Sequence, residues 1–274
     1  MTVLQAVILG IVQGLTEFVP VSSSAHLAIV PWLAGWSFEP HAAFLFDVLV
    51  QLGTLIPLFV IFRADLARIL LGLARAVLQP GGSWTDDARL GLWVMVGTLP
   101  AAALGLVVKD RVEAAFAEPR AIFVFLLITG LILVAGERLA RRQRGLSQLS
   151  AVDAIIVGLA QALALFPGLS RSGATIAAGR ARGFSRAEAA RFSFLLAIPA
   201  LAGAGLVAAT DLGSVEGVSD LLVPIVAGTV ASAVVGYLAI RWLLAFLARR
   251  SLNVFAVYCF ALAIAGLVLS AVRG

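Results

Sequence analysis

The sequence has 274 residues, of which 61% are hydrophobic and 13% are charged, and it carries a formal net charge of +5. Soluble domains average about 45–50% apolar and about 25% charged residues, so this composition excludes an ordinary soluble protein. We expect an all-α integral membrane protein, because a helix satisfies its own backbone hydrogen bonds in lipid.

In chain order, an apolar segment that is broken near its middle is followed by three unbroken ones, and the same order then repeats. Each unbroken segment is near the roughly 17–25 residues that span a bilayer. These six predicted transmembrane helices cover about residues 44–62, 90–108, 121–136, 192–209, 221–240 and 254–272.

The two broken segments cover residues 3–33 and 151–178, and they are interrupted by Pro20 and by Pro167-Gly168. Each half of a broken segment is too short to span a bilayer. Backbone interrupted at membrane depth is tolerated only where it is buried in protein or lines a cavity, so we expect two re-entrant helical hairpins. Two kinked spanning helices are the alternative.

Internal similarity relates the two broken segments. "GIVQGLTEFVPVSSSAH" from Gly10 aligns with "GLAQALALFPGLSRSGAT" from Gly158 after a one-residue gap, with Gly, Gln, Phe, Pro and Ser in register. We therefore expect a single membrane domain over 1–274, built from repeats 1–138 and 151–274. Because three crossings per repeat is an odd number, the second repeat should be inverted relative to the first, as in inverted-repeat transporters.

The basic residues fall mainly on one predicted side of the membrane, which the positive-inside rule makes cytoplasmic. Both termini are then expected to face away from the cytoplasm. The cytoplasmic loops lie beside anionic lipid, which explains the positive charge without nucleic acid. The basic side carries Arg63, Arg68, Arg75, Arg89, Arg138, Arg141, Arg142, Arg144, Arg180, Arg182, Arg186, Arg191, Arg241, Arg249 and Arg250, and the other side carries Lys109, Arg111, Arg120 and Arg273.

Arg171 falls inside a predicted membrane element, in "PGLSRSGAT", and an intramembrane arginine indicates a functional site. Pro167-Gly168 breaks the helix just before it, so the next half-helix should begin here with free N–H groups that favour an anion. With the hydroxyls of Ser170, Ser172 and Thr175, the guanidinium predicts a phosphate-binding site. The alternative is that the hydroxyls pack or cap the helix while Arg171 snorkels or pairs with a carboxylate.

The first broken segment supplies complementary groups. Gln13 and Glu17 are four residues apart and share a helix face, which makes Glu17 the expected partner of Arg171. Ser22, Ser23 and His26 follow the break and add a candidate nucleophile and a base that titrates near neutral pH.

Asp47 and Gln51 also share a face, on the first predicted spanning helix. They are interpreted equally well as lining a cavity or as hydrogen-bonding between helices.

At these residues the sequence resembles the undecaprenyl-diphosphatase family, bacterial membrane enzymes also known as bacitracin-resistance proteins. The resemblance is carried by "QGLTEFVPVSSSAH", "FPGLSRSGATIAAG" and "SRAEAARFSFLLAIPA", in order along nearly the whole chain. Gln13 stands where many relatives have Glu. The resemblance implies hydrolysis of the terminal phosphate of undecaprenyl diphosphate in the bacterial cytoplasmic (inner) membrane, which recycles the lipid carrier of peptidoglycan synthesis and confers bacitracin resistance.

The expected mechanism has Ser23 as nucleophile, with Glu17 orienting it, accepting its proton or holding a divalent cation. His26 is expected to move protons or to be the alternative nucleophile, and attack by metal-bound water stays open. Arg171, Ser22, Ser170, Ser172 and Thr175 are expected to hold phosphate oxygens. The resemblance implies Mg²⁺ or Ca²⁺, and the active-site opening should lie on the periplasmic side. A homodimer is left open. Transport of undecaprenyl phosphate or another anion is the alternative function.

Overall fold

A computed structural model describes residues 1–79, 83–116, 118–211 and 218–272, and these are almost entirely helical, without a strand. Arg273, assigned above to the less basic side, lies outside the described residues. The elements are α1 (Val3–Thr16), α2 (Ser23–Ala34), α3 (Pro40–Gly53), α4 (Leu55–Ile61), α5 (Arg63–Leu78), α6 (Asp86–Phe116), α7 (Pro119–Leu139), the short 3-10 helix η1 (Leu146–Gln148), α8 (Ala151–Leu163), α9 (Arg171–Ala181), α10 (Arg186–Asp211), α11 (Val218–Leu247) and α12 (Asn253–Val272).

Five helices in the described part of the chain are long and apolar enough to cross a membrane, and each covers one of the predicted spans. They are α6, α7, α10, α11 and α12. The all-α membrane class predicted from composition is therefore confirmed.

The remaining predicted span, 44–62, is built from two helices. The chain breaks at Thr54, whose N–H and hydroxyl both donate to the carbonyl of Gln51. Pro57 prolongs the disturbance, because it has no N–H to donate back to the preceding turn. After Phe62 the chain bends by 79° into α5. By length and composition, the segment could cross a membrane only together with α5, as one bent span.

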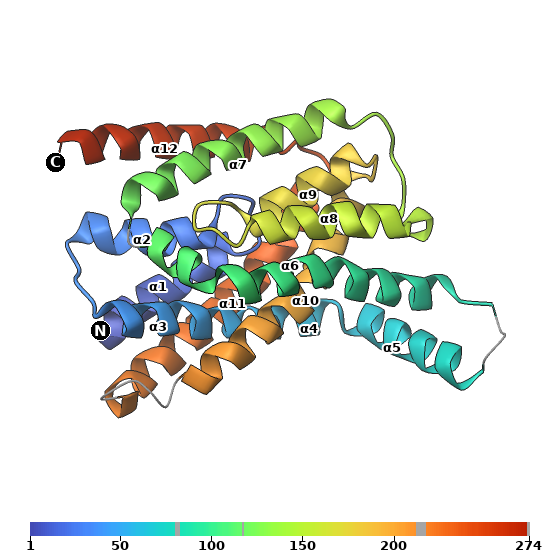
Figure 1. The fold of residues 1–274 in the computed structure, drawn as a ribbon, viewed down its shortest axis with the longest axis horizontal. Helices are drawn as coiled ribbons and strands as arrows, with labels where there is room; N and C mark the ends of the chain where they lie inside the picture. The colour runs from blue at the N-terminus through green and yellow to red at the C-terminus, as the bar shows by residue number, and fades with distance from the viewer. Residues whose placement is uncertain (80–82, 117, 212–217, 273–274) are drawn as a thin grey trace.

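Two helical hairpins occupy the segments predicted to be broken. Figure 1 shows α1 and α2 entering from one end of the molecule and α8 and α9 from the other, with the two turns meeting in the middle. Pro20 lies in the first turn and Pro167-Gly168 in the second, as the sequence predicts. The depth of the hairpins in a bilayer stays a prediction.

The first helix of each hairpin crosses a long helix of the other half at very short distance. A Cβ on Gly10 of α1 would lie 2.2 Å from the carbonyl oxygen of Gly228 in α11, and a Cβ on Gly158 of α8 would lie 2.4 Å from that of Gly97 in α6. Only glycine permits these backbones to approach so closely. The first helix of each hairpin thus packs on a long helix of the other half, which is the arrangement that an inverted repeat would produce. The repeat itself stays a prediction.

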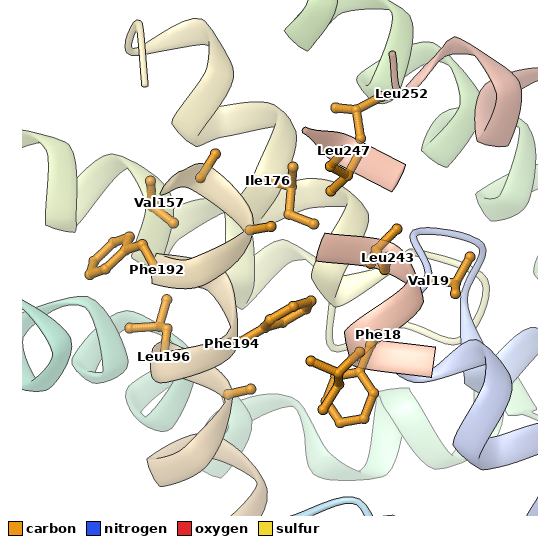
Figure 2. Packing of buried hydrophobic residues seen from close by; sticks show 14 of the residues in the cluster. Phe18, Val19, Val157, Ile176, Phe192, Phe194, Leu196, Leu243, Leu247 and Leu252 are labelled. Atoms are coloured by element: carbon orange, nitrogen blue, oxygen red, sulfur yellow. The ribbon is translucent and has the colours of Figure 1, made fainter. Parts of the chain in front are cut away.

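The hydrophobic core surrounds α10 and reaches the first hairpin turn (Figure 2). The Phe194 ring meets those of Phe18 and Phe62 edge to face, with centroids 5.4 and 6.2 Å apart. Edge-to-face aromatic pairs of this kind add about 0.5–1.5 kcal/mol beyond the area they bury. Phe18 is fully buried and directly follows Glu17, so the core fixes the end of α1.

Ion pairs join the helices at the end of the molecule opposite to the start of α1 and the end of α12 (Figure 1). Glu137 receives two hydrogen bonds of 2.7 Å from Arg186, and Asp153 receives bonds of 2.9 and 2.7 Å from Arg144 and Arg182. Burial would raise the pKa of Asp153, but hydrogen bonds from these two arginines lower it to about 2. These arginines thus lie at the end opposite to the start of α1 (Figure 1), while the side of a membrane that each end faces stays a prediction.

Candidate active site

The two hairpin turns place one carboxylate against one guanidinium. Glu17 follows the last residue of α1, Arg171 opens α9, and the Arg171 Nη2 lies 2.7 Å from the Glu17 Oε1. The two side chains are 4% and 14% exposed, so the pair is largely shielded from solvent. The predicted pair is therefore present in the structure, although the two residues are 154 positions apart in sequence.

The second oxygen of Glu17 accepts two further hydrogen bonds. Gln13 Nε2, one turn earlier on α1, donates to Oε2 over 2.7 Å, and the Ser23 hydroxyl donates to the same atom over 2.7 Å. Ser23 is half-buried at the start of α2, and the bond to Glu17 is the one that the structure gives its hydroxyl among the described residues. The carboxylate is therefore positioned to accept the Ser23 proton.

One nitrogen of the Arg171 guanidinium, Nη1, does not bond to Glu17. Its Nη1 is buried and has no hydrogen-bond partner among the described residues, while its Nη2 is bound to Glu17. Leaving a buried charged donor unpaired is costly. A guanidinium presents its donors in a planar fork that matches phosphate oxygens. The free Nη1, at the N-terminal end of α9, therefore indicates an anion site.

The turn that presents Ser23 is strained. Ser22 has φ 68°, the one positive φ at a non-glycine residue in the described part of the chain. Its hydroxyl caps α2 by accepting from the Ala25 N–H, and it also contacts the Ser24 hydroxyl at 3.1 Å. A residue held in this region costs about 1–3 kcal/mol, and such strain is characteristic of functional sites.

The second hairpin turn is held by groups that sequence analysis only partly identifies. Ser170 caps α9 through a bond from the Gly173 N–H, and its own N–H donates to Thr129 Oγ1 over 3.0 Å. Thr129 in turn donates to the carbonyl of Gly168 over 2.9 Å. Thr129 was not among the predicted residues, because one threonine within a long apolar helix gives no local signal. Ser172 reaches the first turn, donating to the Val19 carbonyl over 3.3 Å.

Three predicted residues lie outside this cluster of hydrogen bonds. The Thr175 hydroxyl is fully buried against α10, 2.8 Å from the Arg171 carbonyl and 2.6 Å from the Ser193 hydroxyl. Asp47 and Gln51 lie on α3, and among the described residues no hydrogen bond joins either side chain to Glu17 or Arg171. The phosphate contact of Thr175 and the pocket role of the α3 pair stay predictions.

His26 lies on α2 with both ring nitrogens engaged. Its Nδ1 is 2.7 Å from the Ser22 carbonyl oxygen, and its Nε2 is 2.7 Å from the Tyr258 hydroxyl of α12. Neither bond reaches Ser23 or Glu17. Tyr258 was not predicted, since it lies 232 positions away in an apolar helix with no motif around it.

The side chains of this site do not fit a metal ion that the protein holds by itself. Both Glu17 oxygens are occupied by donors, and the described residues contain no group of three or more His, Cys, Asp or Glu that would hold a metal. Mg²⁺ and Ca²⁺ need several oxygen ligands.

Comparisons with known proteins show the family of the chain. The family model described as bacitracin resistance protein BacA matches residues 6–265. A protein named undecaprenyl-diphosphatase from a Nocardioides species is 44% identical over 98% of this chain and 96% of its own length. Proteins of the same name from Anaeromyxobacter sp. strain K and Pelotomaculum thermopropionicum are 44% and 40% identical, over 99% and 100% of this chain and 94% and 98% of their own lengths.

Proposed function

The chain belongs to the BacA family of bacitracin resistance proteins, and from this premise we propose that it is an undecaprenyl-diphosphatase. The enzyme hydrolyses undecaprenyl diphosphate to undecaprenyl phosphate and inorganic phosphate. The product is the lipid carrier of peptidoglycan synthesis, and its recycling accounts for bacitracin resistance.

One observation carries the assignment at the level of residues. The Ser23 hydroxyl and the Arg171 guanidinium are hydrogen-bonded to opposite oxygens of the same Glu17 carboxylate, and Arg171 Nη1 is left free. A phosphate bound at Nη1 would lie beside the hydroxyl that attacks it. Nucleophile, proton acceptor and electrophile-binding group are thus assembled before substrate arrives.

In the first step Ser23 Oγ attacks the terminal phosphorus while Glu17 Oε2 takes the hydroxyl proton. A bond forms between Oγ and phosphorus, and the bond from phosphorus to the bridging oxygen breaks. Undecaprenyl phosphate leaves with that oxygen. Arg171 and the first N–H groups of α9 stabilise the charge that moves onto the phosphoryl oxygens.

In the second step water hydrolyses the phosphoserine. Water attacks phosphorus, the bond between phosphorus and Ser23 Oγ breaks, and Glu17 returns to Oγ the proton that it received in the first step. Both protons of the water leave with the inorganic phosphate, so Glu17 is again a carboxylate. Inorganic phosphate leaves and the starting hydrogen bonds reform. The geometry favours Ser23 over His26 as nucleophile, because both His26 nitrogens are already hydrogen-bonded elsewhere.

We propose that Ser22, Ser170 and Ser172 contribute hydroxyls at the rim of the phosphate site. Each is buried at the junction of the two turns, within the network that links them. We propose that the divalent cation implied by the resemblance, Mg²⁺ or Ca²⁺, would be held by the diphosphate itself, because the described part of the chain contains no cluster of three or more His, Cys, Asp or Glu for it.

The chain is a multi-pass membrane protein, and we propose that it lies in the bacterial cytoplasmic membrane with the arginine-rich loops inside. The termini and the opening of the site then face the periplasm, so that the diphosphate head enters from there while the isoprenoid tail stays in lipid.

Phosphate release from undecaprenyl diphosphate by purified protein in detergent tests the function. A transporter has no activity there, since detergent abolishes the two compartments. Ser23→Ala should abolish turnover, whereas Ser147→Ala, a matched change at an exposed serine of η1, should leave it intact. Phosphate trapped on Ser23 after acid quenching supports the covalent step, and full activity of Ser23→Ala contradicts it.

A further inference from the structure

The hydrogen bonds of His26 define where its proton lies. A carbonyl oxygen can only accept, so the 2.7 Å contact with the Ser22 carbonyl requires a proton on Nδ1. In a neutral ring the lone pair is then on Nε2, which lies 2.7 Å from the Tyr258 hydroxyl. Tyr258 donates to Nε2 in that state, and the two rings lie within 8° of parallel. The pair therefore selects one tautomer of His26.

The other end of the ring supports the strained turn. The Ser22 carbonyl accepts from the backbone N–H of His26 at 3.3 Å and, more closely, from its Nδ1. Ser22 is the residue with φ 68°, and Ser23 is next in sequence. A ring that holds this carbonyl therefore limits rotation of the peptide that carries Ser23.

The helix α12 makes a second contact with the same turn. Cys259, the neighbour of Tyr258, is fully buried with its Sγ 3.8 Å from the Pro20 carbonyl oxygen. Two consecutive residues of α12 thus contact the turn at Pro20 and at His26. No other described residue hydrogen-bonds to the Nε2 of His26.

We propose that Tyr258 is a positioning residue of the active site. Its hydroxyl holds His26 neutral with the proton on Nδ1, and the ring in turn fixes the Ser22 carbonyl and the direction of the Ser23 hydroxyl toward Glu17. Tyr258 acts through His26 and does not touch the substrate. This role rests on the proposed function, in which Ser23 is the nucleophile.

Nitrogen-15 NMR of histidine-labelled protein tests the tautomer without any activity measurement. The chain has two histidines, so a His41→Gln variant assigns both signals. We expect a protonated Nδ1 and an unprotonated Nε2 at His26, and in Tyr258→Phe a shift of the Nε2 signal toward that of a nitrogen without a donor. A proton on Nε2 in the unaltered protein overturns the proposal, and this measurement does not depend on how well a variant folds.

Turnover by Tyr258→Phe tests the consequence. Its kcat should fall about tenfold, the order expected for one lost hydrogen bond, while KM stays unchanged because the substrate is not touched. Tyr237→Phe is the matched control, since Tyr237 is the other tyrosine and its hydroxyl meets Arg241 on α11. Equal kcat values for the two variants overturn the positioning role. An inactive unaltered protein with the expected NMR signals would instead refute the proposed function.

Discussion

Glu17→Gln tests the centre of the proposed site with almost no change in shape. In the carboxylate, Oε1 accepts from Arg171 and Oε2 accepts from Gln13 and Ser23. An amide has one accepting oxygen, and its NH₂ group only donates. If the oxygen stays with Arg171, the NH₂ faces Ser23 and the hydroxyl loses its proton acceptor.

The expected loss follows from that missing acceptor. General base catalysis contributes about 10²–10⁴ in rate, so kcat should fall by about that factor, or about 3–5 kcal/mol of activation free energy. The Michaelis constant should not rise. Arg171 loses its charged partner, but its Nη2 stays with the amide oxygen, and its Nη1, which has no partner among the described residues, still serves the diphosphate.

Phosphate release in detergent, with kcat and KM determined separately, is the assay. Glu188→Gln is the control, because Glu188 lies at the start of α10 and meets Arg191 at 3.9 Å, away from the hairpin turns. It should behave like the unaltered enzyme. Equal turnover by the two variants would refute the base role of Glu17, and a raised KM at unchanged kcat would show that Glu17 serves binding instead.

Four further expectations follow from the same structure. Arg171→Lys should lower kcat/KM by about 10² or more, because a point charge cannot replace a planar fork, and a fully active lysine variant would exclude the phosphate-binding role. Gly10→Ala should lower the thermal midpoint sharply, because its Cβ would lie 2.2 Å from a carbonyl oxygen. Gly203→Ala should not, because a Cβ there would meet no atom within 4 Å, and equal midpoints for the two variants would contradict the close helix crossing. The pKa of Asp153 in the folded protein is about 2, below its ordinary value of 3.8. The stability that its ionised form contributes is therefore complete above pH 3.8 and is lost as the pH falls toward 2. In Asp153→Asn, the thermal midpoint should lose this dependence on acid pH, and an unchanged pH profile would argue against the ion pairs. A chelator should reduce turnover without lowering the thermal midpoint, and a lowered midpoint would indicate a metal held by the protein.

The pair of Arg171 and Glu17 was predictable from sequence, because charged side chains within membrane segments are costly. An intramembrane arginine and glutamate are each so costly alone that each implies a partner, and Glu17 in the first broken segment was predicted to pair with Arg171 in the second. Their contact at 2.7 Å agrees with that reasoning. The serine repeat after Pro20 was equally informative, because the hydroxyl of Ser23 is the one that reaches the carboxylate.

Residues whose hydrogen-bond partners depend on how distant helices pack could not be predicted from the local sequence. Tyr258 and Thr129 are single polar residues in apolar helices, and their partners are set by how α12 and α7 pack against the turns. Thr175 is the opposite case, a residue that the sequence does point to. Its spacing fits a phosphate motif, yet its hydroxyl is bonded to the Arg171 carbonyl and to Ser193. Helical periodicity likewise cannot foresee the break at Thr54, which depends on a local hydrogen bond.

The division of the charged pair between the two hairpins has a consequence for biogenesis. In the internal alignment Leu165 stands at the place of Glu17, and Ser24 stands at the place of Arg171, so each half of the chain carries one charge of the pair. A nascent chain that has emerged only as far as α8 holds Glu17 and Ser23 without the cation that balances them. The helix that supports His26, α12, follows both hairpins in the sequence. In the proposed mechanism hydrolysis therefore requires both hairpins, and a product terminated before α9 lacks Arg171 and is expected to be inactive.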